Sequence, residues 1–172
     1  ESKNMYKILR DKGLSEEEVL DILMQKSRDN SRTPVQWDDT KNAGFTSGTP
    51  WIGIPENYKK INAENALKDN NSIFYHYQNL IQLRRTEELL ITGRYEDIDL
   101  ENKKVYAYKR IGENEELIVI SNFYDEVTEF DVKGLDLEKA FILLSNYVQS
   151  PEIKEDKIIL KPYESIIFKK TK

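Results

Sequence analysis

Apolar residues recur at helical spacing in two short runs at the start of the chain. The first run covers residues 5–9 and the second covers residues 19–23, with Gly13 interrupting the pattern between them. Ser15 and Glu18 form the S-x-x-E sequence of a capping box, in which each residue satisfies a backbone N–H of the other. The pattern therefore predicts two short helices.

The helical spacing disappears between residues 27 and 71. This stretch holds three of the seven glycines, three of the five prolines and both tryptophans. Long loops are uncommon in compact domains and are often functional where they occur. A mobile linker is rich in Gly and Ser and poor in aromatics, whereas this stretch carries Trp37, Phe45, Trp51 and Tyr58. We therefore expect an ordered loop without regular structure, lying on a scaffold.

Residues 72–86 carry the clearest helical pattern in the chain. Ile73, Tyr77 and Ile81 share one face, and arginines near the C-terminal end suit the helix dipole. His76, the one histidine, lies beside this face. We expect it to be a boundary residue with its hydrogen bonds satisfied and no chemical role.

After Gly93 the apolar pattern changes to period two, which is typical of strands. Several short strands separated by turn signals predict an antiparallel sandwich or small barrel of about 75 residues. We expect a domain boundary at this point, so that the chain has an α+β fold with a helical and loop portion over 1–93 and an antiparallel β-sandwich over 94–172. The expected strands lie within 104–111, 116–124, 127–132, 140–146, 157–161 and 164–170.

Composition excludes several classes of function. The 172 residues carry a net charge of -5 with no Lys/Arg-rich run, which argues against a nucleic-acid partner. No apolar run approaches the roughly 20 residues that span a bilayer, so no membrane partner is expected. The absence of cysteine excludes disulfides and thiol chemistry and fits a cytoplasmic location. We expect neither a metal nor a cofactor.

A chain that begins with Glu1 and has no apolar leader indicates processing or an excerpt from something longer.

The string SRDNSRTPVQWDD over residues 27–39 is the strongest candidate for chemistry. Sugar hydroxyls both donate and accept hydrogen bonds, and Arg, Asp, Asn and Gln side chains supply matching groups. An indole face packs against the apolar face of a pyranose ring. The alternative is that these side chains satisfy one another and the loop backbone, because loops use Asx turns and Arg–Asp pairs routinely.

Several strings resemble one family closely. SRDNSRTPVQWDD, NAGFTSGTPWI, NYKKINAENAL and SIFYHYQNLIQLRR are similar to the C-terminal portion of a bacterial α-glucosidase subgroup within the α-amylase family of glycoside hydrolases. This subgroup includes oligo-1,6-glucosidases, dextran glucosidases and trehalose-6-phosphate hydrolases, and RDNxRTPxQW is its most specific signature. The resemblance implies that residues 1–93 are the last part of a (β/α)8 barrel, with residues 72–86 as the eighth helix. Active sites of such barrels lie where the loops gather at the strand ends.

The resemblance also implies roles for four residues. Arg28 would reach the glucosyl unit at the cleavage site and pair with an aspartate from an early barrel loop, for which its fork of donors is suited. Asp29 and Arg32 would brace the loop. Trp37 would line the aglycone side or simply pack.

The family hydrolyses its substrates with retention of the anomeric configuration, using a nucleophilic carboxylate and an acid–base carboxylate about 5 Å apart. In relatives these groups lie on earlier barrel strands, which this sequence does not contain. Neighbouring acids such as Asp38 and Asp39 rarely point at one atom, and Glu87 with Glu88 resembles a solvated helix end. We expect neither pair to substitute, and no catalytic residue is assigned.

The leading hypothesis is therefore a C-terminal fragment of a retaining α-glucosidase, inactive alone and partnered by the missing barrel portion. Its substrate would be a small oligosaccharide or a sugar phosphate, namely isomalto-oligosaccharides or trehalose 6-phosphate. SRDNS and NAGFTSGTPWIG look closest to trehalose-6-phosphate hydrolases. The cations available near a phosphate are Lys41, Lys59 and Lys60.

Two other hypotheses remain. The chain could be a non-catalytic carbohydrate-binding or barrel-stabilising module, or an interaction domain whose helix face at Ile73 and Tyr77 self-associates. We interpret the tyrosines at element periods as core and domain-interface packing rather than as a sugar platform. These tyrosines are Tyr75, Tyr77, Tyr106 and Tyr108.

Overall fold

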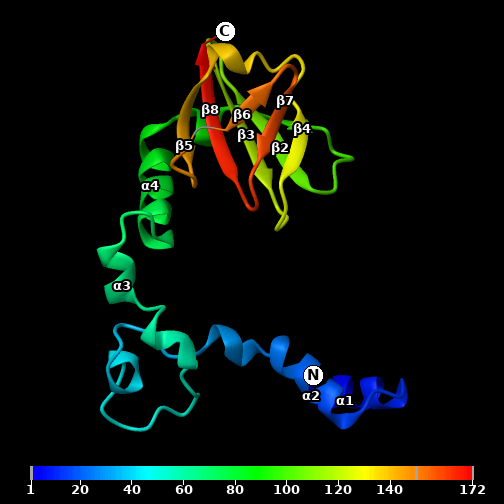
Figure 1. Cartoon of the computed structure of the whole chain (residues 1–172), viewed down its shortest axis with the longest axis vertical. Coiled ribbons are helices and arrows are strands. Elements are labelled where there is room, and N and C mark those ends of the chain that lie inside the picture. Colours follow the sequence, from blue (N-terminus) through cyan, green and yellow to red (C-terminus); the bar gives the residue numbers. More distant parts are fainter. Residues whose placement is uncertain (1, 150, 172) are drawn as a thin grey trace. The chain divides into compact units, whose positions relative to one another are not determined.

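The computed structural model describes residues 2–149 and 151–171. The chain forms two compact units, an N-terminal unit that ends at Asn70 and a C-terminal unit that begins at Asn71 (Figure 1). This division precedes the predicted eighth helix. The helix therefore belongs to the same compact unit as the strands, while the domain boundary near residue 93 stays a prediction.

The N-terminal unit begins with the two predicted helices, α1 (Ser2–Asp11) and α2 (Glu16–Gln25). The capping box ahead of α2 is formed as expected. The Glu18 backbone N–H donates to the Ser15 hydroxyl oxygen over 3.2 Å, and the Ser15 N–H donates to the Glu18 carboxylate over 2.8 Å. These bonds satisfy two N–H groups that a helix start otherwise leaves unpaired, and they lower the pKa of Glu18.

The stretch predicted to lack regular structure contains short helices, so that part of the prediction was wrong. Single 3-10 turns present no repeating face, which is why apolar periodicity does not detect them. The longer helix α3 is capped at its start by Asn62, whose side-chain oxygen accepts from the Asn65 N–H over 2.8 Å. The elements are η1 (Arg28–Ser31), η2 (Lys41–Gly44), η3 (Glu56–Lys59) and α3 (Ala63–Lys68).

The N-terminal unit has almost no core of its own. Among its described residues only Val19, Ala43 and Asn62 are buried. Burial of apolar surface is the main term that offsets the conformational entropy lost on folding, so this unit is not stabilised by internal packing. Its large exposed apolar side chains include Val35, Trp37, Phe45, Trp51, Ile61 and Leu67.

The C-terminal unit contains α4, the predicted helix, followed by a short helix α5 and eight antiparallel strands in the described residues. One sheet has five strands in the order β1-β2-β3-β8-β5, and the other has three in the order β4-β7-β6. All six predicted strands are present, and β1 and β6 are additional. The bounds are α4 (Ile73–Thr86), α5 (Leu89–Thr92), β1 (Arg94–Ile98), β2 (Val105–Ile111), β3 (Glu115–Asn122), β4 (Thr128–Asp131), β5 (Phe141–Ser145), β6 (Glu152–Lys154), β7 (Lys157–Leu160) and β8 (Ser165–Thr171).

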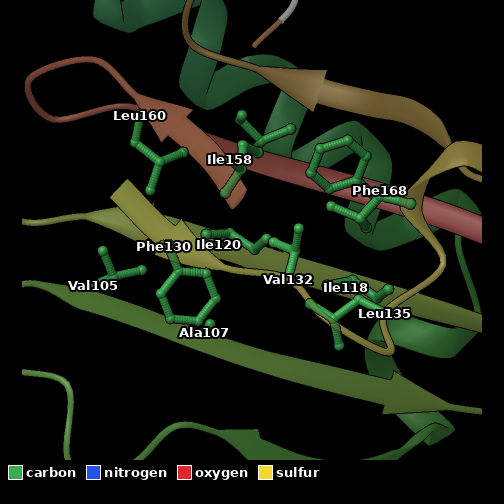
Figure 2. Packing of buried hydrophobic residues seen from close by; sticks show 12 residues of the cluster. Val105, Ala107, Ile118, Ile120, Phe130, Val132, Leu135, Ile158, Leu160 and Phe168 are labelled. Carbon is green, nitrogen blue, oxygen red and sulfur yellow. The ribbon is translucent and has the colours of Figure 1, made fainter. Parts of the chain in front are cut away.

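The hydrophobic core lies between the two sheets, which confirms the predicted sandwich. Alternate residues of β2, β3 and β8 point toward the three-stranded sheet, whose Phe130, Ile158 and Leu160 complete the cluster (Figure 2). Full burial of side chains of this size stabilises a fold by about 1.5–3 kcal/mol each. The core members are Val105, Ala107, Ile118, Ile120, Phe130, Val132, Leu135, Leu137, Ile158, Leu160, Ile166 and Phe168.

The end of α4 and the short helix α5 are bound to the outer face of the five-stranded sheet. The Arg110 guanidinium donates to three backbone carbonyls of α5, at distances of 3.4, 3.3 and 3.1 Å. Lys169 Nζ lies 2.9 Å from the Glu87 carboxylate, and both side chains are largely buried. Glu87 was expected at a solvated helix end, and this was wrong because β8 supplies a cation that the sequence pattern does not reveal.

The four tyrosines expected in packing do not belong to the buried core. Tyr77 and Tyr106 are exposed, whereas Tyr75 and Tyr108 are half-buried. The prediction of core packing was therefore wrong, while domain-interface packing stays a prediction. His76 is half-buried, as expected for a boundary residue. No helix in the described part of the chain is long and apolar enough to cross a bilayer.

Candidate functional site

The backbone that carries Arg28 is fixed by local hydrogen bonds. The Ser27 hydroxyl oxygen accepts from the Asp29 N–H over 3.2 Å, and the Ser31 hydroxyl donates to the Arg28 carbonyl over 2.8 Å. They support the single 3-10 turn of η1, which the Asn30 N–H closes by donating to the Ser27 carbonyl over 3.1 Å. The side chains of Arg28 and Asp29 therefore project from a defined turn rather than from a mobile loop.

Asn30 ties this turn to the preceding helix. Its side-chain amide donates to the Met24 and Gln25 carbonyls over 2.8 and 3.1 Å. These carbonyls belong to the last turn of α2, where a helix leaves acceptors without internal partners. Sequence reasoning assigned no role to Asn30, because a bond from a loop to the end of a helix leaves no periodic signal.

Arg28 and Asp29 line a groove of about 410 Å³ beside the first two helices. The groove combines apolar side chains with polar and charged groups, which is the mixture that small-molecule sites use for burial and orientation. Its other lining residues are Ser2, Met5, Leu9, Ile22, Leu23, Lys26 and Ser27.

Arg32 is paired with Asp29 beside the groove. Its guanidinium lies 3.8 Å from the Asp29 carboxylate, and the two side chains are 57% and 63% exposed. Exposed ion pairs contribute only about 0–1 kcal/mol, so this contact restrains the loop weakly. Trp37 lies outside the groove. Of the four predicted residues, the structure therefore places Arg28 and Asp29 together, with Arg32 beside Asp29 and Trp37 apart.

The backbone of Trp37 is held from both sides. Its N–H donates to the Ala43 carbonyl over 2.9 Å, and its carbonyl accepts from the Glu64 N–H over 2.9 Å. The loop is therefore anchored to α3 and to the turn of η2. The indole itself remains 54% exposed, so it is available for contact with a ligand or with further polypeptide.

The Asp38 carboxylate has a structural role in the turn that follows Trp37. Its carboxylate accepts hydrogen bonds from the Thr40 hydroxyl and the Thr40 N–H, which lower the pKa of Asp38. Three successive residues, Asn42, Ala43 and Gly44, then have φ of 57°, 54° and 65°. Such left-handed backbone is strained in residues other than glycine. The carboxylate of Asp38 thus stabilises a turn, and no catalytic task is needed to explain it.

Gly44→Ala is expected to disrupt this turn. A Cβ at Gly44 would lie 2.5 Å from Asp38 Oδ2, and the left-handed φ adds strain, so the Ala43–Trp37 hydrogen bond should be lost. Amide NMR shifts should change throughout residues 36–46. In the matched control Gly48→Ala, the nearest atom to the new Cβ lies 3.6 Å away, and the spectrum should remain close to that of the parent. Equal changes in both variants would contradict this account.

The described residues hold no group of three or more His, Cys, Asp or Glu side chains that could bind a metal. Lys41, Lys59 and Lys60 are exposed. The groove offers the Arg28 guanidinium, the Lys26 ammonium and the Asp29 carboxylate, which is a set suited to recognising hydroxyl groups.

Two family models match the chain. The model of the alpha amylase catalytic domain matches residues 2–93, and the model of the alpha-amylase SusG C-terminal domain matches residues 105–167. The chain therefore belongs to the α-amylase family, whose members are glycoside hydrolases. This family and the α+β fold are those expected from the sequence, and both are confirmed.

The chain matches individual relatives over nearly its whole length but spans only about 30% of their length. Trehalose-6-phosphate hydrolase from Bacillus subtilis is 49% identical over 177 residues, which is 100% of this chain and 31% of the relative. Oligo-1,6-glucosidase from Halalkalibacterium halodurans is 44% identical over 98% of this chain and 30% of its own length. The crystal structure of Bacillus licheniformis trehalose-6-phosphate hydrolase superposes with a TM-score of 0.88 at 49% identity, over 99% of this chain and 31% of that chain.

Proposed function

We propose that this chain works as the C-terminal part of a retaining α-glucosidase and supplies part of its glucose-binding site. The observation that carries the proposal is the ordered RDNSRTPVQW loop, which presents Arg28 and Asp29 on a groove in a chain of this family. The relatives named above are by their names a trehalose-6-phosphate hydrolase and an oligo-1,6-glucosidase, which supports a sugar substrate here.

The lack of a core in the N-terminal unit supports a need for further polypeptide. Trp51 is 90% exposed, and a side chain of this size is usually buried or part of an interface. The C-terminal unit also exposes large apolar side chains, on one face of α4. There Ile73 is 85% exposed, and Tyr77 and Ile81 are exposed beside it. A barrel portion that packs against these surfaces would cover them and complete the groove.

Arg28 is proposed to orient the glucosyl unit that is cleaved. A guanidinium presents donors in a rigid plane, so it can hold a carboxylate with one edge and a sugar hydroxyl with another. Asp29 and Arg32 are proposed to hold the turn in which Arg28 lies, and Trp37 to contact the leaving-group side. The nucleophile and the acid–base carboxylate of a retaining mechanism would come from the barrel portion.

Trehalose 6-phosphate is the proposed substrate, with isomalto-oligosaccharides as the alternative. The first is favoured by the 49% identity to a trehalose-6-phosphate hydrolase, compared with 44% for an oligo-1,6-glucosidase. The exposed Lys41, Lys59 and Lys60 are the cations of this loop that could meet a phosphate.

The chain alone is expected to release no glucose from p-nitrophenyl α-glucoside or trehalose 6-phosphate, because it lacks the two carboxylates. Mixing it with Bacillus subtilis trehalose-6-phosphate hydrolase from which the matching segment is deleted should restore hydrolysis. Glucose release is measured by a coupled assay, with the deleted enzyme alone as the control. Turnover by the pure chain would overturn the proposal, as would an inactive covalent chimaera in which this chain replaces the matching segment.

A further inference from the structure

Four aromatic side chains form a cluster on the outer face of β1 and β2 and just after the end of β3. The ring centroids of Tyr95 and Tyr108 are 5.3 Å apart, those of Tyr106 and Tyr108 are 5.5 Å apart, and those of Tyr106 and Phe123 are 6.5 Å apart. The first two pairs are inclined by only 30° and 41°, so the three tyrosine rings make a shallow platform. Separations in this range are typical of favourable aromatic pairs.

Polar groups lie within the same cluster. The Tyr95 hydroxyl donates to the Asp97 carboxylate and lies 2.8 Å from the Tyr106 hydroxyl. The bond to Asp97 is the main cause of a raised pKa at Tyr95, so this hydroxyl stays protonated well above neutral pH. The platform therefore presents both donors and acceptors at the edge of its rings.

The sandwich core does not account for this cluster. Val105 and Ala107 point into the core from the same strand, so Tyr106 and Tyr108 lie on the opposite face of the sheet. On β3 the outward-facing Leu117 and Val119 are buried, whereas Tyr106 is 46% and Phe123 is 65% exposed. Within the described part of the C-terminal unit, the outer face is thus covered over β3 and open over the aromatic platform.

We propose that the aromatic platform of Tyr95, Tyr106, Tyr108 and Phe123 binds a neutral glucosyl oligosaccharide, as a second sugar site that is separate from the groove at Arg28. Aromatic faces pack on the C–H faces of pyranose rings, and the tyrosine hydroxyls and Asp97 pair with sugar hydroxyls at the rim. The site goes beyond the proposed function and does not depend on it.

Charge favours a neutral ligand here over a sugar phosphate. Asp97 places a negative charge at the rim of the platform, where it would repel a phosphate. The cations beside the platform are already paired: the Arg110 guanidinium is bonded to the carbonyls of α5, and Lys104, opposite Phe123, lies 2.5 Å from the Glu126 carboxylate. The platform therefore selects neutral isomalto- or malto-oligosaccharides.

The test is a titration of the 172-residue chain with isomaltotriose, followed by amide NMR. Shifts are expected in residues 94–111 and 121–124, with millimolar affinity. Trehalose 6-phosphate at equal concentration should shift them less. Tyr106→Ala should weaken binding about tenfold, which corresponds to about 1.4 kcal/mol. Tyr106→Phe keeps the ring, so it should retain most of the affinity. The matched control is Phe141→Ala, an exposed aromatic on β5 that should leave affinity unchanged.

Phe123→Ala is a second variant in case Tyr106→Ala does not fold, because Phe123 follows the strand β3 and is more exposed. It should also weaken binding. Absence of shifts in β1 and β2 would overturn the proposal, and shifts confined to residues 27–37 would do so while supporting the groove at Arg28. Loss of the binding in the longer chimaeric enzyme would also overturn it, because the platform would then be a contact surface for polypeptide.

Discussion

Arg28→Ala is expected to lower kcat/KM by at least about a hundredfold in the chimaeric enzyme that carries this chain. The proposed partner is an aspartate of the barrel portion, and removal of one member of a buried charged pair costs about 3–5 kcal/mol because the other charge stays buried without its partner. The loss should appear in steady-state hydrolysis of trehalose 6-phosphate, with the folded state checked by circular dichroism.

Arg94→Ala provides a matched control for this result. Its guanidinium lies 2.9 Å from the Glu96 carboxylate in an exposed pair, so its removal should change kcat/KM less than about twofold. Arg28→Lys should recover little activity, because a single ammonium does not reproduce the planar fork. A loss of less than about fivefold in Arg28→Ala would mean that this arginine is exposed and structural.

Phe130→Ala is expected to destabilise the C-terminal unit by about 3–5 kcal/mol, because the side chain is 1% exposed and its removal leaves a cavity between the sheets. Urea unfolding of the chain, followed by far-UV circular dichroism, measures the change. Tryptophan emission is unsuitable because Trp37 and Trp51 both lie in the N-terminal unit.

The control for Phe130→Ala is Phe141→Ala on β5, whose side chain is 57% exposed. It removes the same atoms from a strand of the same sandwich, and it should change stability by less than about 0.5 kcal/mol. Similar losses in the two variants would mean that the space between the sheets is not the main source of stability.

The hydrophobic pattern predicted six strands and missed β1 and β6, which are each at one edge of a sheet. β2 begins with alternating buried and exposed residues, whereas β3 and β8 carry short continuous apolar runs, and both patterns are typical of strands. β1 has the sequence RYEDI with no buried residue, and it is a strand because it pairs with β2. Its register is therefore a tertiary property, which local sequence does not encode.

The loop around Arg28 was located from sequence chemistry, but its surroundings were not. The string of charged and amide residues pointed to 27–39, and the family resemblance singled out Arg28. That Met5 and Leu9 line the same groove follows from how α1 and α2 lie beside the turn. Spacing along the chain carries no information on such contacts. The platform at Tyr106 was missed for a related reason. Tyrosines that share one face of a strand have the same spacing in the sequence whether that face is exposed or buried.

The position of β8 has a consequence for biosynthesis. This strand lies between β3 and β5, so β5 has no neighbour in its sheet until residues 165–171 have been translated. Folding of the C-terminal unit on the ribosome must therefore wait for its last strand, although domains generally fold in the order in which they emerge. Lys169 on the same strand holds Glu87, so a premature stop codon before residue 165 would also remove this ion pair and leave Arg110 of β2 to hold α5.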